Sequence, residues 1–272
     1  MIEEKNDEVQ YDEAFLRMLL DEENIESFRE HFLVLHPYDQ AQFYEEVGPD
    51  IRQIIYRYLS PQETAIIFET TEIEDDEYKT YLDEMDPSYG AAMFGFMYTD
   101  NAVDILNELD TEQRENYLEM MDEETVDEIN ELLGYEEYTA GAIMTTEYVS
   151  VVESATVREA MRVLRQEAQT AETIYYIFVV DQAHRLLGVM SLRELIVAEG
   201  DLYIRDIMSE RVVSVKVTDD QENVANLIKD YDLLAIPVVN ENRELQGIIT
   251  VDDIIDVIEE EAEDDYSKLA GI

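Results

Sequence analysis

The sequence predicts an α+β multidomain protein, in which an N-terminal all-α superhelical repeat domain is followed by a tandem pair of α/β units. Two observations carry this prediction. Signals for the start of a helix recur every twelve residues through much of the first half of the chain, which is typical of short stacked helices. In the second half strand-like runs alternate with helical stretches, and the whole pattern occurs twice, in units of about sixty residues.

The helix starts of the first half are marked by residues that suit a first helical turn. Proline fits there because a first-turn N–H has no intrahelical partner, whereas proline disrupts a helix interior. The marks are His36-Pro37, Gly48-Pro49 and Ser60-Pro61, followed after one slip in spacing by Asp86-Pro87, Tyr98-Thr99 and Asp110-Thr111.

Each of these short helices has one apolar stripe. In one unit the apolar residues lie three and four apart, as at Ile51, Ile54 and Ile55. A helix this short cannot bury its stripe alone, so the helices are expected to stack into a superhelix. We expect helices of about two to three turns, preceded by a longer helix around Asp12–Leu20 and closed by Asp122–Gly134, with the glycine as its stop.

The second half contains two copies of a strand–helix–strand–strand–helix pattern. An Ile-Met pair opens each copy, at Ile143-Met144 and at Ile207-Met208. Each copy closes on a glycine, a hydroxyl residue and an acid in the same spacing, in Gly188–Glu194 and in Gly247–Asp253. Two such copies are expected to pair their sheets about a pseudo-twofold axis. The predicted strands are Val149–Val152, Ile174–Val180, Val212–Val217 and Ile236–Val239, and the predicted helices are Val157–Glu167 and Glu222–Tyr231.

The chain is strongly acidic but has enough apolar residues for a packed core. It contains 67 Asp and Glu against 18 Lys and Arg, a formal net charge of -49, while 46% of its residues are apolar. Self-repulsion of this size opposes compaction, which favours cation binding over the plainer interpretation, a solvated surface. DNA, RNA and anionic membrane surfaces are unfavourable partners, because their phosphates would be repelled.

Several other classes of protein are disfavoured. There is no cysteine, so disulfides and thiolate metal sites are excluded, in keeping with the cytosol. We expect no signal peptide and no membrane span, because the longest apolar runs, Ile174–Val180 and Leu233–Val239, fall far short of the ~20 apolar residues of a spanning helix. The three histidines are scattered and no metalloprotease, serine-hydrolase or phosphate-loop motif occurs, so we expect no enzyme.

The last predicted helix has one apolar face, with acids on the others. Near its start the helix dipole stabilises acids, so Asp252 and Asp253 fit a solvated surface. Towards its end the dipole disfavours acids, and like charges three and four apart cost about 0.2–0.5 kcal/mol each, which favours a cation site. The face expected to be buried comprises Val251, Ile254, Ile255, Ile258 and Ala262. The acids near the end are Glu259, Glu260, Glu261, Glu263, Asp264 and Asp265.

The two repeats resemble CBS domains, and the chain resembles the cytosolic portion of MgtE-type magnesium transporters over roughly residues 25 to 268. The opening and closing motifs carry the first resemblance; Tyr138–Gly141, Glu172–Tyr176 and Thr250–Val257, preceded by a helical array, carry the second. The resemblance implies a helical superhelix at 1–135, CBS domains at 136–203 and 204–265, and at 266–272 the start of a linker towards an absent transmembrane domain.

The resemblance further implies a magnesium sensor. Mg2+ would bridge acidic faces of the helical domain and the CBS pair and favour a compact, pore-closed state, and oxygen ligands suit this hard cation. It also implies several Mg2+ ions, a homodimer through the CBS domains, the protein's own C-terminal transmembrane pore, and a place at the cytoplasmic face of the cell membrane. The matching metal positions are Asp100, Asp104, Asp220, Asp232, Asp253, Asp256, Glu261, Asp264, Asp265 and Glu69.

CBS pairs often bind adenine nucleotides between their units, which implies ATP as a second ligand. Tyr176 would stack on adenine and Arg193 would meet phosphate, while Ser191, Glu194 and Thr250 occupy the closing motifs that contact ribose or phosphate. The family typically has Asp where this chain has Glu194, and Tyr176 also fits a strand residue packed in the core. Two alternatives therefore stay open: a CBS-based adenine-nucleotide sensor whose helical domain holds a protein partner, and a plain scaffold.

Overall fold

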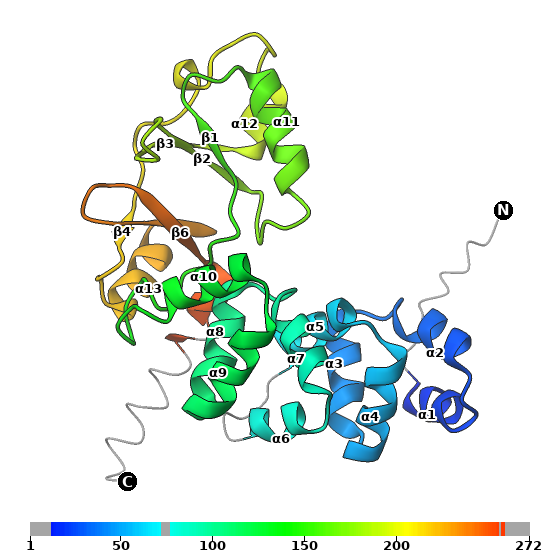
Figure 1. The fold of residues 1–272 in the computed structure, drawn as a ribbon. Coiled ribbons are helices and arrows are strands. Elements are labelled where there is room, and N and C mark those ends of the chain that lie inside the picture. The colour runs from blue at the N-terminus through cyan, green and yellow to red at the C-terminus, as the bar shows by residue number, and fades with distance from the viewer. Residues whose placement is uncertain (1–11, 72–76, 256, 259–272) are drawn as a thin grey trace, which may run out of the picture. The chain divides into compact units, whose positions relative to one another are not determined.

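The structure is a computed structural model that describes residues 12–71, 77–255 and 257–258. These residues form two compact units. One runs to Met97 and includes Asn101–Asp127; the other consists of Tyr98–Asp100 together with the chain from Glu128 onward. The predicted fold class is confirmed, since short helices occupy the first half and two three-stranded sheets with their own helices follow (Figure 1).

The first unit is an array of short helices. Pro37, Pro49, Pro61 and Pro87 each lie in the first turn of a helix, as predicted. Next-but-one helices contact each other, α3 with α5, α5 with α7 and α7 with α9, so each apolar stripe is covered by the array. The helices are α1 Glu13–Asp21, α2 Ile25–Phe32, α3 Pro37–Glu46, α4 Pro49–Tyr58, α5 Pro61–Thr70, α6 Tyr78–Asp83, α7 Pro87–Phe94, α8 Thr99–Glu108, α9 Thr111–Met120 and α10 Glu123–Leu132.

Side-chain caps explain why these helices begin where they do. His36, Ser60, Asp86 and Asp110 each accept a hydrogen bond from a first-turn N–H, which satisfies a donor that has no intrahelical partner. The caps and prolines are local signals, so the sequence predicts the starts closely. The prediction that α1 is longer than the helices after it is wrong, because α1 ends after nine residues.

An ion pair lies among aromatic rings in the core of the first unit. Arg52 Nε and Nη2 donate to the two carboxylate oxygens of Glu84 at 2.7 and 2.6 Å, and both side chains are less than a tenth exposed. The guanidinium carbon also lies 4.4 Å from the centroid of the Tyr81 ring. Removal of either partner would leave the other charge buried and uncompensated, which destabilises the folded state.

The second unit contains two sheets with the same strand order. In each sheet the first strand is parallel to the second, which is antiparallel to the third. Residues 251–255 and 257–258 are helical and follow the last strand. The elements are β1 Ser150–Val152, α11 Val157–Glu167, β2 Tyr176–Val180, β3 Leu186–Ser191, α12 Leu192–Val197, the 3-10 turn Ile204–Asp206, β4 Val215–Lys216, α13 Gln221–Asp230, β5 Ala235–Val239 and β6 Leu245–Thr250.

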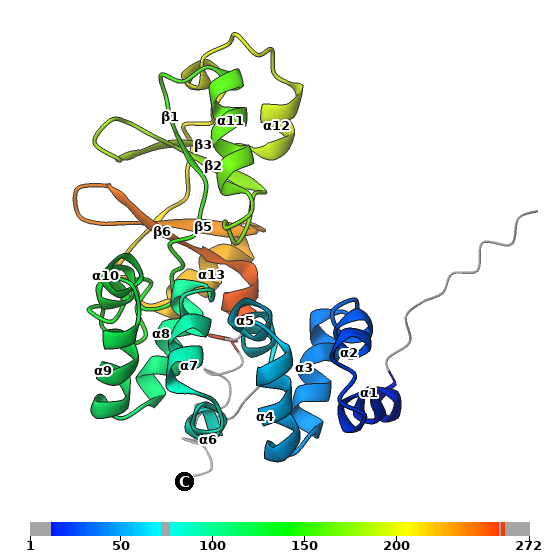
Figure 2. The same ribbon diagram turned by 45° about the vertical axis from the view of Figure 1, so that its right-hand side comes forward.

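Alternate residues of β2 pack into two different cores. Ile177 and Val179 join a cluster with α11 and α12, which cover one face of this sheet (Figure 2). Phe178 and Val180 point to the other face and pack with residues of β5 and β6, such as Ile248. Because successive strand residues face opposite sides, one apolar strand can hold its own helices and the second repeat together.

The two repeats join through equivalent residues, in agreement with the predicted pseudo-twofold pairing. Leu186 N–H donates to the Arg243 carbonyl at 2.8 Å, and Leu245 N–H donates to the His184 carbonyl at 2.9 Å. His184 and Arg243 stand at the same place in the two repeats, and both have a positive φ, of 60° and 63°. The same uncommon backbone conformation therefore occurs twice at this junction.

The last helix buries only part of the face that was predicted. Ile254 and Val257 are 1% and 6% exposed, whereas Ile255 and Ile258, which were expected to be buried, are 51% and 47% exposed. Residues three apart share a side of a helix, so the helix has two apolar sides and only the first is covered within one chain. Ala262 lies outside the described residues.

Candidate metal centre

Three carboxylates that are far apart in the sequence meet in the second unit. One carboxylate oxygen from each of Asp100, Glu172 and Asp253 lies within 4.8 Å of the other two. Asp100 lies in the first turn of α8, Glu172 between α11 and β2, and Asp253 in the helix after β6. All three belong to the second unit, which includes Tyr98–Asp100. Asp100 is only 5% exposed and the others are partly buried. We call these three residues the acidic cluster.

A helix cap orients Asp253. The N–H and the hydroxyl of Thr250 donate to Asp253 Oδ2 at 3.1 and 2.6 Å, and Asp253 N–H donates back to Thr250 Oγ1 at 3.4 Å. This reciprocal pattern is a capping box with Asp in place of the usual Glu. It holds one oxygen of Asp253 and fixes the direction of the side chain.

The acidic cluster is electrostatically unfavourable without a cation. Burial raises the pKa of Glu172 to about 7, the charge of Asp253 adds to the rise, and the hydroxyls of Thr250 and Thr145 oppose it. Burial also raises the pKa of Asp253. Glu172 Oε2 is buried, and no hydrogen-bond donor of the described residues reaches it. Because buried oxygens normally have a donor or a cation, and because all ligand atoms are oxygens, the cluster fits a hard divalent cation.

The raised pKa of Glu172 predicts how pH changes stability in the absence of metal. An unfolded Glu titrates near 4.5 and the folded one at about 7, so the folded state holds the extra proton between these values. The stabilising contribution is full below pH 4.5 and is lost as the pH rises towards 7. We expect urea denaturation in EDTA to show this loss, and Glu172→Gln to remove it. Equal pH slopes for the variant and the wild type would contradict the assignment.

The other acids predicted as metal ligands do not join the acidic cluster among the described residues. Asp104 is an exposed residue of α8, and Glu69 is a partly buried residue of α5. Asp220 is exposed and caps α13, where it accepts from the N–H groups of Glu222 and Asn223. Asp232 is exposed just after α13, with a positive φ of 51°. Asp256, Glu261, Asp264 and Asp265 lie outside the described residues.

The residues predicted for a nucleotide lie at the start of β2, at the ends of the equivalent strands β3 and β6, and in the first turn of α12. Tyr176 is paired with Ser191 across β2 and β3, and it packs at the edge of the core between the sheets. Ser191 and Glu194 form a capping box at the start of α12, and Arg193 is exposed. Thr250, the equivalent of Ser191, is buried and serves the cap of Asp253. The closing motifs are therefore helix caps in both repeats.

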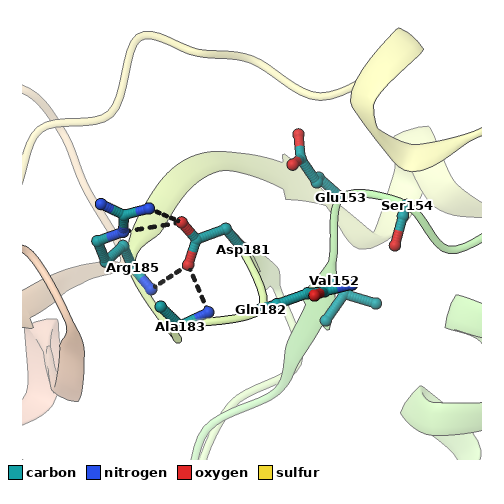
Figure 3. A pocket seen from close by; sticks show the side chains of 7 residues that line it. All are labelled: Val152, Glu153, Ser154, Asp181, Gln182, Ala183 and Arg185. Atoms are coloured by element: carbon teal, nitrogen blue, oxygen red, sulfur yellow. Dashed lines mark hydrogen bonds and ion pairs between the residues drawn. The ribbon is translucent and has the colours of Figure 1, made fainter.

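A shallow pocket elsewhere in the first repeat contains none of the predicted site residues. Asp181 occupies the hairpin turn, where it accepts bonds from the N–H groups of Ala183 and Arg185, both at 2.9 Å, and from Arg185 Nε at 2.8 Å (Figure 3). The Asp181 carboxylate and the Arg185 guanidinium are paired with each other within the turn, so the turn accounts for these two lining residues. The lining residues are Val152, Glu153, Ser154, Asp181, Gln182, Ala183 and Arg185.

Sequence reasoning missed Glu172 as a site residue. The sequence marks it only as part of the stretch Glu172–Tyr176, because a lone acid before a strand carries no periodic signal. A comparison of the two repeats would have singled it out, since the equivalent position in the second repeat is Tyr231. The acid therefore belongs to one copy alone, as expected for a local role and not for a shared feature of the fold.

The fold defines the class of protein, a helical repeat domain joined to a tandem CBS pair. Residues 35–138 match the family described as the MgtE intracellular N domain, and residues 140–201 and 204–260 match the CBS domain. The chain is 54% identical to the magnesium transporter MgtE of Enterococcus faecalis and 37% identical to that of Thermus thermophilus, over 95% and 94% of its length. It spans 57% of the length of each of these relatives.

Two solved structures are similar over nearly their whole length. The soluble part of a magnesium transporter is 54% identical with a TM-score of 0.89, and covers 92% of this chain and 98% of its own. The cytosolic domain of the Mg2+ channel MgtE in complex with ATP is 37% identical with a TM-score of 0.84, and covers 90% and 99%. The chain belongs to the MgtE family of magnesium transporters and corresponds to their cytosolic portion, as the sequence motifs predicted.

None of the helices among the described residues combines the length and the apolar character needed to span a bilayer.

Proposed function

We propose that this chain is the Mg2+-sensing regulatory region of a magnesium transporter, at the cytoplasmic face of the cell membrane. We propose further that Mg2+ bridges acidic faces of the helical domain and the CBS pair and favours a compact state in which the protein's own C-terminal transmembrane pore is closed, and that one of these ions is held at the acidic cluster. The observation that carries the proposal is the meeting of Asp100, Glu172 and Asp253, drawn from three separate parts of the chain.

The energetics favour a cation-dependent state. Two unscreened charges ~4 Å apart repel by ~4 kcal/mol at an effective dielectric of ~20, and a divalent cation between them reverses the sign. Magnesium usually keeps several waters and takes few protein carboxylates. The acidic cluster supplies the carboxylate ligands that such an ion needs. The net charge of -49 on the whole chain adds to the attraction for cations.

One ion is not enough for a complete switch. Moving a two-state equilibrium from 1:99 to 99:1 takes about 5.5 kcal/mol, whereas a site at about five times its dissociation constant contributes only about 1 kcal/mol. We therefore propose several Mg2+ ions, with the remaining predicted acids as further ligands. These are Asp104, Asp220, Asp232, Asp256, Glu261, Asp264, Asp265 and Glu69.

Exposed apolar residues support a homodimer through the CBS domains. Ile196 and Val197 in α12 are 62% and 77% exposed, and Ile255, which is equivalent to Ile196 in the second repeat, is 51% exposed. Isolated exposed apolar residues are ordinary, but their recurrence at an equivalent position fits a face that a second copy covers. We propose no catalytic activity and no nucleic-acid partner, and the relatives that match nearly the whole chain are named as transporters.

ATP is the second candidate ligand, because a similar cytosolic domain has been solved with it. The residues proposed to hold it are Tyr176, Ser191, Arg193, Glu194 and Thr250. In this structure Ser191 and Thr250 already serve helix caps. The alternative function, an adenine-nucleotide sensor with a helical partner-binding domain, requires a response to nucleotide in the absence of metal.

The proposed function predicts compaction by magnesium. We expect the scattering radius and the protease sensitivity of the chain to fall between EDTA and millimolar Mg2+. Asp100→Asn and Asp253→Asn are expected to raise the midpoint of this change by about tenfold or more, because each removes one ligand of a bridging ion. The matched control is Asp201→Asn, which removes an acid that is 93% exposed and paired with Arg158.

The same titration separates the alternatives. A second arm adds ATP in EDTA, which removes free metal. Compaction by nucleotide alone would favour the adenine-nucleotide sensor, and no response to either ligand would favour a scaffold. Equal resistance of the chain to protease in EDTA and in Mg2+ would contradict the magnesium proposal.

A further inference from the structure

We infer that Glu147 is a positioning residue that holds Asp100 and Glu172 in the acidic cluster and so sets how tightly the cluster binds Mg2+. Glu147 lies in the segment between the opening Ile-Met pair and β1, and it was not among the predicted ligands. The inference rests on the proposed function, because it concerns the same cluster, but it assigns a role to a residue that binds no metal itself.

The carboxylate of Glu147 accepts hydrogen bonds from three threonines. Its Oε1 accepts from the N–H and the hydroxyl of Thr99 at 3.2 and 2.6 Å. Its Oε2 accepts from the Thr145 hydroxyl at 2.6 Å and from the Thr146 N–H at 3.1 Å. The Thr146 hydroxyl also reaches the Thr99 hydroxyl at 3.3 Å. Hydrogen bonds to a charged acceptor are among the strong ones, so this network is well held.

These bonds leave Glu147 poorly suited to be a metal ligand. Its Oε1 accepts from one N–H and one hydroxyl, and its Oε2 accepts from the Thr146 N–H and from the hydroxyls of Thr145 and, at 3.4 Å, Thr146. It is not among the three acids whose oxygens converge. The network therefore satisfies the Glu147 carboxylate without a cation.

Glu147 takes the place of a local cap at the start of α8. The residue before this helix is Tyr98, whose long aromatic side chain is not among the residues that cap helices. Other helices of the array are capped from the preceding residue, for example by Ser60 and Asp110. The Thr99 N–H donates to an acid 48 residues further along the chain, so one first-turn N–H of α8 is satisfied by the first repeat of the CBS pair.

The network reaches two of the three acids. Thr99 is the neighbour of Asp100, so fixing its backbone and hydroxyl fixes the position from which the Asp100 side chain leaves the helix. The carbonyl of Glu147 accepts from the Glu172 N–H at 2.9 Å, which fixes the second acid. The third acid, Asp253, has its own cap from Thr250. Thr99, Thr250 and the main chain of Glu147 thus position the three acids of the cluster.

The test is a calorimetric Mg2+ titration of the full chain, using MgCl2 alone. We expect Glu147→Gln to weaken Mg2+ binding roughly 10- to 100-fold, the range seen when a residue that orients a metal ligand is lost. An amide cannot replace the carboxylate, because it offers one acceptor oxygen and its NH2 would face donors. Thr99→Ser keeps the hydroxyl and is expected to bind like the wild type, whereas Thr99→Val is expected to weaken binding.

The matched control is Glu159→Gln, which removes the same kind of capping carboxylate from α11, outside the cluster. A purely structural role for Glu147 would lower the melting temperature without moving the Mg2+ affinity. A double-mutant cycle adds a second readout: with Asp100→Asn already present, Glu147→Gln is expected to cost little further affinity. Additive losses, or unchanged affinity in Glu147→Gln, would overturn the inference.

The proposed function and this inference fail differently. If the wild type does not bind Mg2+, the proposed function is wrong. If the wild type binds and Asp100→Asn weakens binding while Glu147→Gln does not, the magnesium site stands and only the positioning role is lost.

Discussion

Replacing Arg52 by alanine is expected to destabilise the helical unit by about 3–5 kcal/mol, because it leaves the Glu84 carboxylate buried without its partner. The pair is bidentate and less than a tenth exposed on either side. The substitution also removes the contact of the guanidinium with the Tyr81 ring. Urea denaturation followed by far-ultraviolet circular dichroism measures the loss, and hydrogen exchange of α4 amides locates it in this unit.

Two comparisons make the expectation specific. Lys79→Ala breaks a pair with Asp110 in which both side chains are more than half exposed, and such pairs contribute at most about 1 kcal/mol. The double substitution Arg52→Met with Glu84→Leu removes both charges and keeps apolar volume, so we expect it to be more stable than Arg52→Ala. A loss for Arg52→Ala no larger than for Lys79→Ala would contradict the burial of this pair.

Gly247→Ala is expected to destabilise the second unit by about 3 kcal/mol, at the upper end for overpacking in a core. A Cβ at this position would stand 2.5 Å from the Thr145 carbonyl oxygen and 2.9 Å from Met144 Cγ and Sδ. The carbonyl cannot move freely, because it accepts from the Ile248 N–H at 3.0 Å. Relief of the clash therefore breaks a hydrogen bond that joins the opening of the first repeat to β6.

The measurement is thermal unfolding with Gly200→Ala as the control. A Cβ at Gly200 meets only the Arg158 side chain, at an ordinary 3.5 Å, so we expect a change within about 0.5 kcal/mol. Gly188→Ala, at the equivalent position in the first repeat, should also destabilise, because its Cβ would stand 2.9 Å from the Ser209 carbonyl oxygen. Equal stability of Gly247→Ala and Gly200→Ala would show that the two repeats are not packed this closely.

The elements that the sequence predicted well depend on local chemistry. Prolines and capping side chains place the starts of α3, α4, α5 and α7, because a first helical turn needs donors satisfied whatever the rest of the fold does. The two-copy pattern likewise located α11 and the strands β2 and β5, since buried strands are apolar throughout. Errors arose where packing decides, as with Ile255 and Ile258, because periodicity alone does not say which of two apolar sides is covered.

The candidate site was predicted only in part. The resemblance to the family implies Asp100 and Asp253 as metal ligands, and the structure brings them together with Glu172. Glu172 and Glu147 lie in irregular segments, where no period marks a residue as special. Their roles depend on distances between atoms that are far apart in the chain, which a linear pattern does not encode.

The sequence by itself determined the helical array, the tandem CBS pair, the acidic character and the oxygen-only chemistry that suits magnesium, because each follows from residue type and short-range spacing. Only the tertiary structure decided which three acids converge, which acid caps the start of α8 and which glycines lie against the opposite repeat. These depend on long-range packing, in which a side chain's role is set by neighbours that the folded chain brings to it.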